Sequence, residues 1–386
     1  MTNTRLPRTV VAVSAATMVL GLGESLWKKF LPRYLEALGA PIRAIGVYGS
    51  LSDLIDGLYQ YPGGWLGDHL GRRRALLLFV LSALTGYAIY AFLPTWKFAL
   101  VALLFAAAWS SMASPTLFAV IGDALPRERR AIGFTLLAIL KRVPVLIAPI
   151  VGGLVIARLG MLDGMHLLFL ATIAMAVVTW FVIQRVDLPP LAAGVATIAG
   201  VWSAFPRPLR WLLVSDVFIR TCEGMAEVFL VIYATKVIGV SAPQFGVLIS
   251  VQTITSIAVY LPAARHADRL GRKPFVIATF LAFALFPLAV AFSTSFGTAV
   301  FAYVIGGLRE IGEPSRKALI VDYAHESMRA RTVGLYYLIR SVAIAPAAIV
   351  GGLLWERSPA TPLIVACAIG IAGTIVFAMT VRNGEQ

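Results

Sequence analysis

The sequence predicts an all-α membrane protein, with twelve transmembrane helices in two pseudo-symmetric six-helix bundles. Three observations predict it: an apolar composition, about twelve long hydrophobic stretches, and an internal repeat. Of the 386 residues 59% are hydrophobic and 13% are charged, with a mean hydropathy of +0.84. A soluble domain carries roughly 25% charged residues, so this chain has too few polar side chains to cover a surface in water. Lipid is the solvent that fits.

The hydrophobic stretches have the length of membrane-spanning helices, which need about 20 apolar residues. They are too uniformly apolar for barrel strands, which alternate at every second residue. A backbone in lipid must satisfy its own hydrogen bonds, so each stretch is predicted to be a helix. The predicted spans are 8–35, 43–67, 73–92, 97–122, 131–158, 164–184, 209–236, 242–266, 273–293, 297–323, 329–356 and 360–381.

The positions of the basic residues predict the orientation. A net charge of +14 first suggests nucleic-acid binding. With a cytoplasmic N-terminus, however, 18 of the 33 Lys and Arg residues fall in inner loops or tails and six in outer loops. This positive-inside bias predicts a multi-pass protein of the bacterial cell inner membrane with both termini cytoplasmic. The basic loops face anionic lipid headgroups, and a nucleic-acid partner is not expected.

Residues 9–22 resemble the core of a signal peptide, but the apolar run continues into Glu24 without a convincing cleavage site, which favours an uncleaved first span. The two cysteines, Cys222 and Cys367, lie in apolar spans and are interpreted as small buried hydrophobic residues. The four histidines lack the spacing of metal ligands, and no phosphate-binding loop is present. We therefore expect no metal, no cofactor and no built-in ATP hydrolysis.

The chain is an internal duplication. The residues Pro62, Asp68, Leu70, Gly71 and Arg72 recur 200 residues later, and the Ile-Val-Gly-Gly segment at 150–153 recurs 199 residues later. One register over so much of the chain predicts two homologous halves. With six spans each, the halves share one orientation and are related by an axis along the membrane normal. The predicted domains are 1–184 and 209–386, joined by a proline-rich cytoplasmic linker at 185–208 whose apolar run is too short for a span.

The loop between the second and third spans carries a recognisable motif. Residues 64–74 read GWLGDHLGRRR, and residues 264–273 of the second half read ARHADRLGRK. These loops resemble the signature G-x-L-x-D-R-x-G-R-R/K of the major facilitator superfamily. His69 replaces the usual Arg in the first copy, and Ala264 replaces the first Gly in the second. Gly71 permits a tight turn, and Asp68 at a helix end can accept charge-assisted hydrogen bonds.

The resemblance implies a secondary transporter that acts as a monomer by alternating access. In the family, the matching Asp and Arg residues hold the cytoplasmic sides of the halves together. That implies a cytoplasmic gate of Asp68, Arg72, Asp123, Asp268 and Arg272. The alternative is that the basic residues only set the topology.

Span 5 contains Ala148-Pro149-Ile150-Val151-Gly152-Gly153, which weakly resembles the family's antiporter signature G-P-x-x-G-G. Small residues also let helices approach closely, so helix packing alone would explain the segment. Span 4 lacks the arginine of many proton-coupled members.

Ionisable residues inside the spans are the candidate site. Each costs about 2.5–3.5 kcal/mol at the bilayer centre, so such groups face a cavity or one another. Asp216, Arg220, Glu223 and Glu227 share one face of span 7. Span 10 presents Arg309 and Glu313 in a similar stripe, with either Arg316 or Lys317. The predicted substrate and proton pathway comprises Glu24, Lys28, Asp53, Asp56, Lys141, Arg142, Arg220, Glu223, Glu227, Arg309, Glu310, Glu313 and Arg340.

Two interpretations of these charges stay open. They form structural ion pairs between helices, or they line a hydrated path for a solute and protons. In the second, the acidic groups Glu24, Asp56, Glu223 and Glu227 carry a proton, and the cations hold an anion or repel that proton. We expect proton-driven transport of a small solute, with export ahead of uptake or exchange of an organic anion. A membrane enzyme or sensor on the same scaffold is a distant alternative, because no compact catalytic constellation is visible.

Overall fold

The protein is described from a computed structural model that covers residues 8–114, 116–117, 130–185, 205–323 and 329–381. These residues form helices and their connections, with no strand among them. The first half contains α1 (Arg8–Trp27), α2 (Leu31–Ala37), α3 (Ile42–Leu70), α4 (Arg72–Phe92), α5 (Trp96–Ala107), η1 (Ala108–Met112), α7 (Arg130–Leu159) and α8 (Met161–Gln184). The second contains α9 (Arg207–Glu227), α10 (Leu230–Ile232), η4 (Tyr233–Ile238), α11 (Ala242–Leu270), α12 (Lys273–Ala291), α13 (Phe296–Leu308), α14 (Glu313–Tyr323), α15 (Arg329–Ile344), α16 (Ala347–Trp355) and α17 (Thr361–Thr380).

Within the described residues, each of the twelve predicted spans coincides with a helix or with consecutive helical segments, which confirms the all-α fold class. Seven helical stretches of the described chain are long and apolar enough on their own to cross a membrane. The others are shortened by interruptions or carry more charge. The helices are therefore where hydropathy placed them, but several are not continuous.

Four of the interruptions follow the repeat. Span 1 breaks after Trp27 and span 7 breaks after Glu227, a separation of 200 residues. Span 4 changes to the π-helix η1 at Ala108, and span 10 breaks after Leu308. Irregular backbone at membrane depth is tolerated only where protein buries it or where it lines a water-filled cavity, and π-helical turns are frequent at functional sites. These four breaks fall at matching places in the two halves. Span 11 is also interrupted, between Ile344 and Ala347, whereas its counterpart α7 is continuous.

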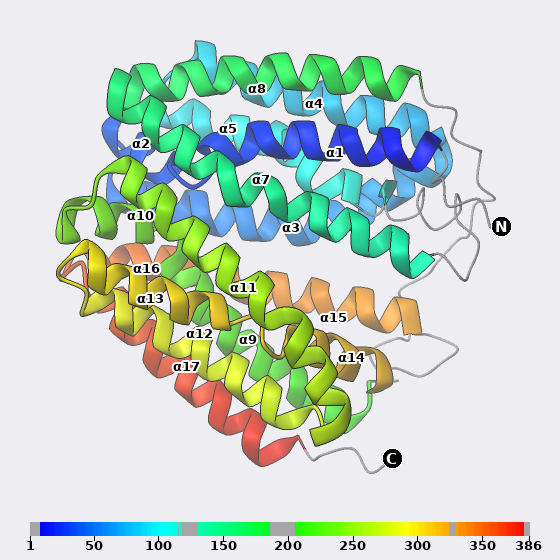
Figure 1. The fold of residues 1–386 in the computed structure, drawn as a ribbon, viewed down its shortest axis with the longest axis vertical. Helices are drawn as coiled ribbons and strands as arrows, with labels where there is room; N and C mark the ends of the chain where they lie inside the picture. Colours follow the sequence, from blue (N-terminus) through cyan, green and yellow to red (C-terminus); the bar gives the residue numbers. More distant parts are fainter. Residues whose placement is uncertain (1–7, 115, 118–129, 186–204, 324–328, 382–386) are drawn as a thin grey trace. The chain divides into compact units, whose positions relative to one another are not determined.

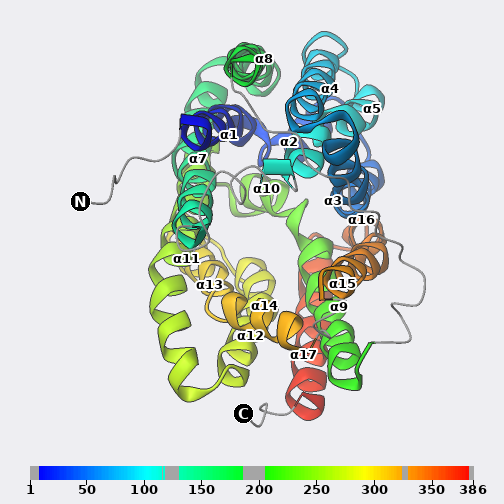
Figure 2. The ribbon, with the colours of Figure 1, turned by 90° about the vertical axis from the view of Figure 1, so that its right-hand side faces the viewer.

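The chain divides into two compact units, Met1–Ala40 with Ile55–Val195, and Pro41–Leu54 with Ala196–Gln386. In the first unit α1 packs against α7 and α8, and α4 packs against α5 and α8 (Figure 1). In the second unit α9 packs against α16 and α17, and α12 packs against α13 and α17 (Figure 2). The neighbours are equivalent in the two units, so the sequence duplication is also a duplication of helix packing.

Glycines of the repeat occupy backbone conformations that other residues avoid. Gly39 and Gly239 have φ of 82° and 81°, and Gly71 and Gly271 have φ of 81° and 87°. Gly71 ends the connection before α4, and Gly271 follows α11 in the matching loop. A side chain would strain the backbone at these φ values. The tight turn expected at Gly71 is confirmed, and Gly271 repeats it.

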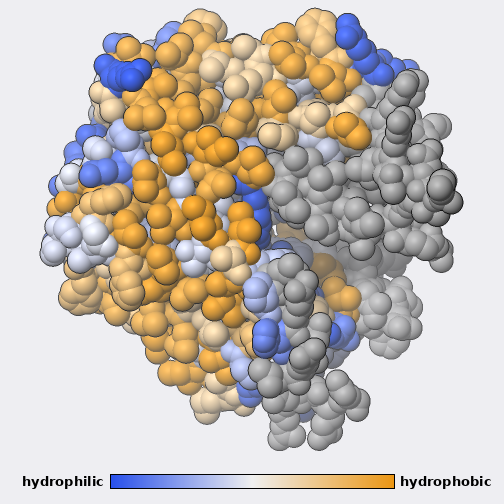
Figure 3. Space-filling view, in the orientation of Figure 1, coloured by the Kyte–Doolittle hydropathy of each residue, from blue (hydrophilic) through white to orange (hydrophobic). Residues whose placement is uncertain are grey.

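The outer faces of the helices are apolar, as a lipid solvent requires. Hydrophobic side chains cover most of the described surface in Figure 3. Large apolar side chains are highly exposed on both units, including Phe92, Phe292, Phe301 and Met379 with exposed fractions of 64%, 73%, 68% and 79%. A soluble protein of this size would not expose such contiguous apolar area. The chain is therefore a multi-pass membrane protein.

Candidate functional site

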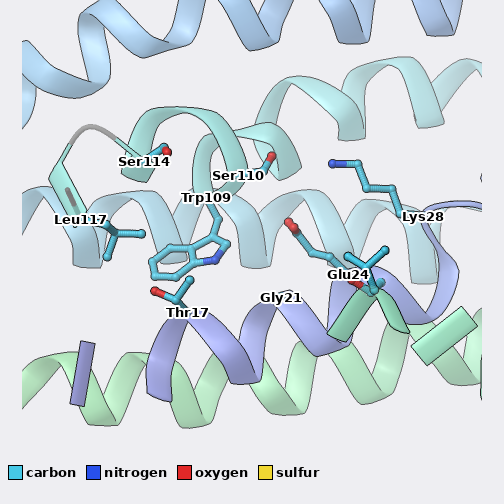
Figure 4. A pocket seen from close by; sticks show the side chains of 10 residues that line it. Thr17, Gly21, Glu24, Lys28, Trp109, Ser110, Ser114 and Leu117 are labelled. Atoms are coloured by element: carbon cyan, nitrogen blue, oxygen red, sulfur yellow. The ribbon is translucent and has the colours of Figure 1, made fainter. Parts of the chain in front are cut away.

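The first unit contains a cavity of about 250 Å³ between α1, η1 and α7 (Figure 4). It lies where span 1 breaks and where span 4 becomes a π-helix. One carboxylate, one ammonium group and one indole line it, together with several hydroxyls. The lining residues are Thr17, Gly21, Glu24, Ser25, Lys28, Trp109, Ser110, Ser114, Leu117 and Val145.

Glu24 is fixed in the cavity wall by a neutral partner. The phenol of Tyr87, on α4, donates a hydrogen bond of 2.6 Å to the Glu24 carboxylate. The ring of Tyr87 is itself buried and packs edge-on against Trp27. The Trp27 indole donates to Thr172 at 3.0 Å, which ties this end of α1 to α8. The carboxylate is thus held in position by a hydroxyl rather than by a guanidinium group.

Lys28 belongs to the same cavity. It follows the last residue of α1, and its backbone N–H donates to the Glu24 carbonyl at 3.0 Å, so the two residues stand one helical turn apart. Its side chain is exposed, and Figure 4 shows it reaching toward the cavity from the broken end of the helix. The break in span 1 therefore places a cation beside an anion in one small space.

A second polar contact in the first unit joins α3 to the π-helix. The Ser111 hydroxyl donates to the Asp56 carboxylate at 2.8 Å. Ser111 is buried within η1, whereas Asp56 is exposed. The π-helical turn thus aims Ser110 at the cavity and its neighbour Ser111 at Asp56, because successive helical residues point in different directions.

The second unit contains a buried network of charged side chains. Its centre is Arg316 of α14, of which 2% of the side chain is exposed. The Arg316 guanidinium donates to the Asp216 carboxylate at 2.7 Å and to both oxygens of Glu313 at 2.6 and 2.7 Å. Asp216, which is fully buried on α9, also accepts from the Tyr336 hydroxyl at 3.1 Å and from Arg340 at 3.3 Å. These bonds join α9, α14 and α15.

The network continues along α9. Arg220 donates to Glu223 at 2.7 Å and to Glu313 at 2.9 Å. Arg309, in the break of span 10, donates to Glu223 at 3.1 Å. The Arg220 and Arg309 guanidinium groups each lie 4.9 Å from the centre of the Phe283 ring, a cation–π distance. Each of the three carboxylates is therefore paired with at least one guanidinium group.

The structure brings together five of the predicted pathway residues in one network with Asp216, which the sequence placed on the same face of span 7. The five are Arg220, Glu223, Arg309, Glu313 and Arg340. The structure places Glu24 and Lys28 in the separate cavity of the first unit and gives Asp56 its own partner. The other predicted members that it describes are half-buried: Asp53, Arg142, Glu227 and Glu310. The Lys141 side chain lies outside the described residues.

Only part of the predicted gate falls within the described residues. Arg72 is buried at the start of α4. Arg272 forms an ion pair with Asp322, the residue that the repeat makes equivalent to Asp123. The side chains of Asp68 and Asp268, and the whole of Asp123, lie outside the described residues.

The sequence did not identify several residues of the first-unit cavity and of the second-unit ion network. The span 10 stripe left Arg316 and Lys317 as alternatives; Arg316 is buried in the network, and Lys317 is exposed. Tyr87, Tyr336 and Trp109 were not predicted, because an aromatic residue in an apolar span has the pattern of ordinary core. No signal in one span identifies a hydrogen-bond partner in another.

Twelve spans in two repeated units, with broken helices and paired charges inside them, define a polytopic membrane transporter. The family model of the Major Facilitator Superfamily matches residues 13–222 and 212–385. The chain belongs to this family. An uncharacterized MFS-type transporter of Methanocaldococcus jannaschii is 19% identical, with 92% of this chain and 90% of that protein covered. A Na(+), Li(+), K(+)/H(+) antiporter of Planococcus maritimus is 28% identical, with 39% of this chain and 36% of that protein covered.

The fold comparison agrees. The crystal structure of the nucleoside transporter NupG matches with a TM-score of 0.80 at 14% identity. The match covers 98% of this chain and 100% of that chain. At this identity the likeness shows the fold alone. The family and the relatives indicate a transporter rather than an enzyme.

Proposed function

We propose that this protein is a proton-coupled secondary transporter that exports a small solute by alternating access, with Glu24 as its proton carrier. The proposal depends on the Glu24 carboxylate. It lines a cavity beside the break in span 1, and it accepts a hydrogen bond from the phenol of Tyr87. A carboxylate in a membrane span is a functional candidate by default. The proton gradient is the energy source, and no cofactor takes part.

Glu24 suits the role better than the acidic groups of the second unit. Protonation of Asp216, Glu223 or Glu313 would remove one charge from an ion pair with a buried or half-buried guanidinium group, and breaking a buried pair costs about 3–5 kcal/mol. Protonation of Glu24 disturbs a hydrogen bond to a neutral hydroxyl, and the cation beside it, Lys28, is exposed and not buried in an ion pair. Of the proton carriers expected from the sequence, Glu24 is therefore preferred to Glu223.

The direction of transport rests on the relatives and the orientation. The printed name of the Planococcus maritimus relative describes an antiporter that exchanges cations for protons. Applied to this chain, antiport against inward-moving protons amounts to export. We place the protein in the bacterial inner membrane as a monomer with cytoplasmic termini, on the positive-inside distribution of its basic residues.

Uptake or exchange of an organic anion is the second candidate. In the network of the second unit, the guanidinium groups of Arg220, Arg309, Arg316 and Arg340 face three carboxylates, Asp216, Glu223 and Glu313. These four guanidinium groups outnumber the three carboxylates by one. A carboxylate or phosphate group of a solute would pair with the guanidinium groups through charge-assisted hydrogen bonds.

Proteoliposomes test the proposal. Compounds that raise the melting temperature of the purified protein are added to vesicles with an imposed pH gradient, and internal pH is followed with a trapped dye. Solute-dependent proton movement is expected for the natural sequence and for Glu36→Gln, a matched change in α2 outside the cavity. Glu24→Gln should move no protons, even at solute concentrations that saturate its binding. Proton movement that survives Glu24→Gln would refute the assignment.

A further inference from the structure

The cavity of the first unit holds opposite charges at close range. Glu24 and Lys28 both line it and are separated by one helical turn, so their Cβ atoms are about 5–6 Å apart. The hydrogen bond that Glu24 accepts comes from Tyr87, which occupies one side of the carboxylate. A carboxylate offers about four lone-pair sites, so acceptor capacity remains toward the cavity. The ammonium of Lys28 offers three donors.

The size of the cavity limits the solute. Its volume of about 250 Å³ is just below the range of roughly 300–1,000 Å³ that holds drug-sized ligands. Within the first unit the space therefore suits a solute of amino-acid size rather than a large polycyclic drug.

The rest of the lining adds one aromatic surface and several hydroxyls. Trp109 of η1 and Leu117 provide the apolar side, and Ser25, Ser110 and Ser114 provide the polar side. Figure 4 shows the Trp109 indole and the Glu24 side chain both lying in the space between α1 and η1. An indole face binds the edges of other aromatic rings and also binds cations. The wall thus has one apolar surface beside a pair of unlike charges.

From this arrangement we infer that the solute is a small zwitterion, whose ammonium group binds Glu24, whose carboxylate or other acidic group binds Lys28, and whose apolar body packs on Trp109. The inference rests on the proposed function in taking this cavity as the solute site. It goes further in naming the class of solute. The α-amino and α-carboxylate groups of an amino acid are close enough to meet side chains that are one helical turn apart.

The alternatives leave a charge without a partner. A simple amine would pair with Glu24 and bring a second cation toward Lys28. A simple organic acid would pair with Lys28 and bring a second anion toward Glu24. Like charges at close range repel, whereas a zwitterion satisfies both groups at once.

A matched series of compounds tests the class. Tryptophan, tryptamine and indole-3-propionate have one indole body and carry both charges, only the positive charge and only the negative charge, respectively. Phenylalanine, phenethylamine and 3-phenylpropionate repeat the series with a smaller body. Binding to the full-length protein in detergent is measured by isothermal titration calorimetry at pH 7.

We expect at least one zwitterion to bind about tenfold more tightly than its amine and its acid, because each of those loses one charged contact. Lys28→Gln should remove the preference for the zwitterion over the amine. Glu24→Gln should remove the preference over the acid. Lys29→Gln, the same change at the next residue and outside the cavity lining, should change neither preference.

Three results would overturn the inference: an amine or acid that binds as tightly as its zwitterion, no saturable binding of either zwitterion up to about 10 mM, or preferences that survive Lys28→Gln and Glu24→Gln. The proton assay separates this failure from that of the proposed function. Zwitterion binding without solute-dependent proton movement refutes the coupling and keeps the site, whereas proton movement driven only by amines or acids refutes the solute class and keeps the coupling.

Discussion

Gly152 of α7 and Leu26 of α1 are in such close contact that a Cβ on the glycine would stand 1.9 Å from the leucine carbonyl oxygen. The repeat reproduces the contact in the second unit, where a Cβ on Gly351 would stand 2.5 Å from the Met225 carbonyl oxygen. Both residues of each pair are related by 199 positions. The Gly-Gly segment that resembles an antiporter signature therefore has a packing role in both halves, as small residues do between membrane helices.

Gly152→Ala and Gly351→Ala should destabilise the protein, because backbone cannot move aside for a methyl group as a flexible side chain can. We expect a loss of about 1–3 kcal/mol or more for each, measured by SDS-induced unfolding in mixed micelles. Gly334→Ala is the matched control, since a Cβ there meets nothing within 4 Å; in a helix it should be neutral or slightly stabilising. Equal effects at all three positions would contradict the packing role.

The buried ion network should matter far more to stability than an exposed ion pair. Asp216→Asn removes the shared partner of Arg316 and Arg340, and we expect a cost of about 3–5 kcal/mol. Asp322→Asn breaks the ion pair with Arg272. The Arg272 side chain is 36% exposed and the Asp322 side chain 53% exposed, so the loss should be no more than about 1 kcal/mol. The same unfolding assay compares the two.

A double-mutant cycle between Asp216→Asn and Arg316→Gln locates the effect. The double variant should be more stable than the sum of the single losses predicts, because the second change removes a charge that the first left unpaired. Strict additivity would mean that the two residues contribute independently, contrary to their 2.7 Å contact.

Two turn glycines should respond differently to asparagine. Gly239 is left-handed, with φ 81° and ψ 20°, a region that asparagine tolerates. Gly271 has φ 87° and ψ 155°, a region essentially restricted to glycine. No neighbour obstructs a Cβ at either position, so only backbone strain acts. Gly239→Asn should be nearly neutral and Gly271→Asn should cost about 1–3 kcal/mol, read as a lower melting temperature. A larger loss at Gly239 would contradict this.

Cysteine labelling tests the proposed orientation. Thr95 lies in the exposed connection between α4 and α5, and Arg185 is exposed after α8. A membrane-impermeant maleimide should label Thr95→Cys in intact cells and Arg185→Cys only after permeabilisation, because the basic loops are predicted to be cytoplasmic. The natural Cys222 and Cys367 are buried and provide a low background. The reversed labelling pattern would mean the opposite orientation.

Much of the fold follows from the sequence by itself. The positions of the spans follow from hydropathy, because lipid accepts only apolar helices whose backbone is internally bonded. The duplication predicted equivalent helices, and the positive-φ glycines at 71 and 271 keep the same turn in both halves. The helical period also placed Asp216, Arg220 and Glu223 on one face.

The partners of those charges were decided only by the tertiary structure. A period of 3.6 residues states which side chains share a face, but the approach of another helix determines which atoms come within 3 Å. It is this approach that selects Arg316 over Lys317 for Asp216 and gives Glu24 the phenol of Tyr87. The same limit applies to the breaks at Trp27 and Glu227, since hydropathy records the apolar length of a span and not the continuity of its hydrogen bonds.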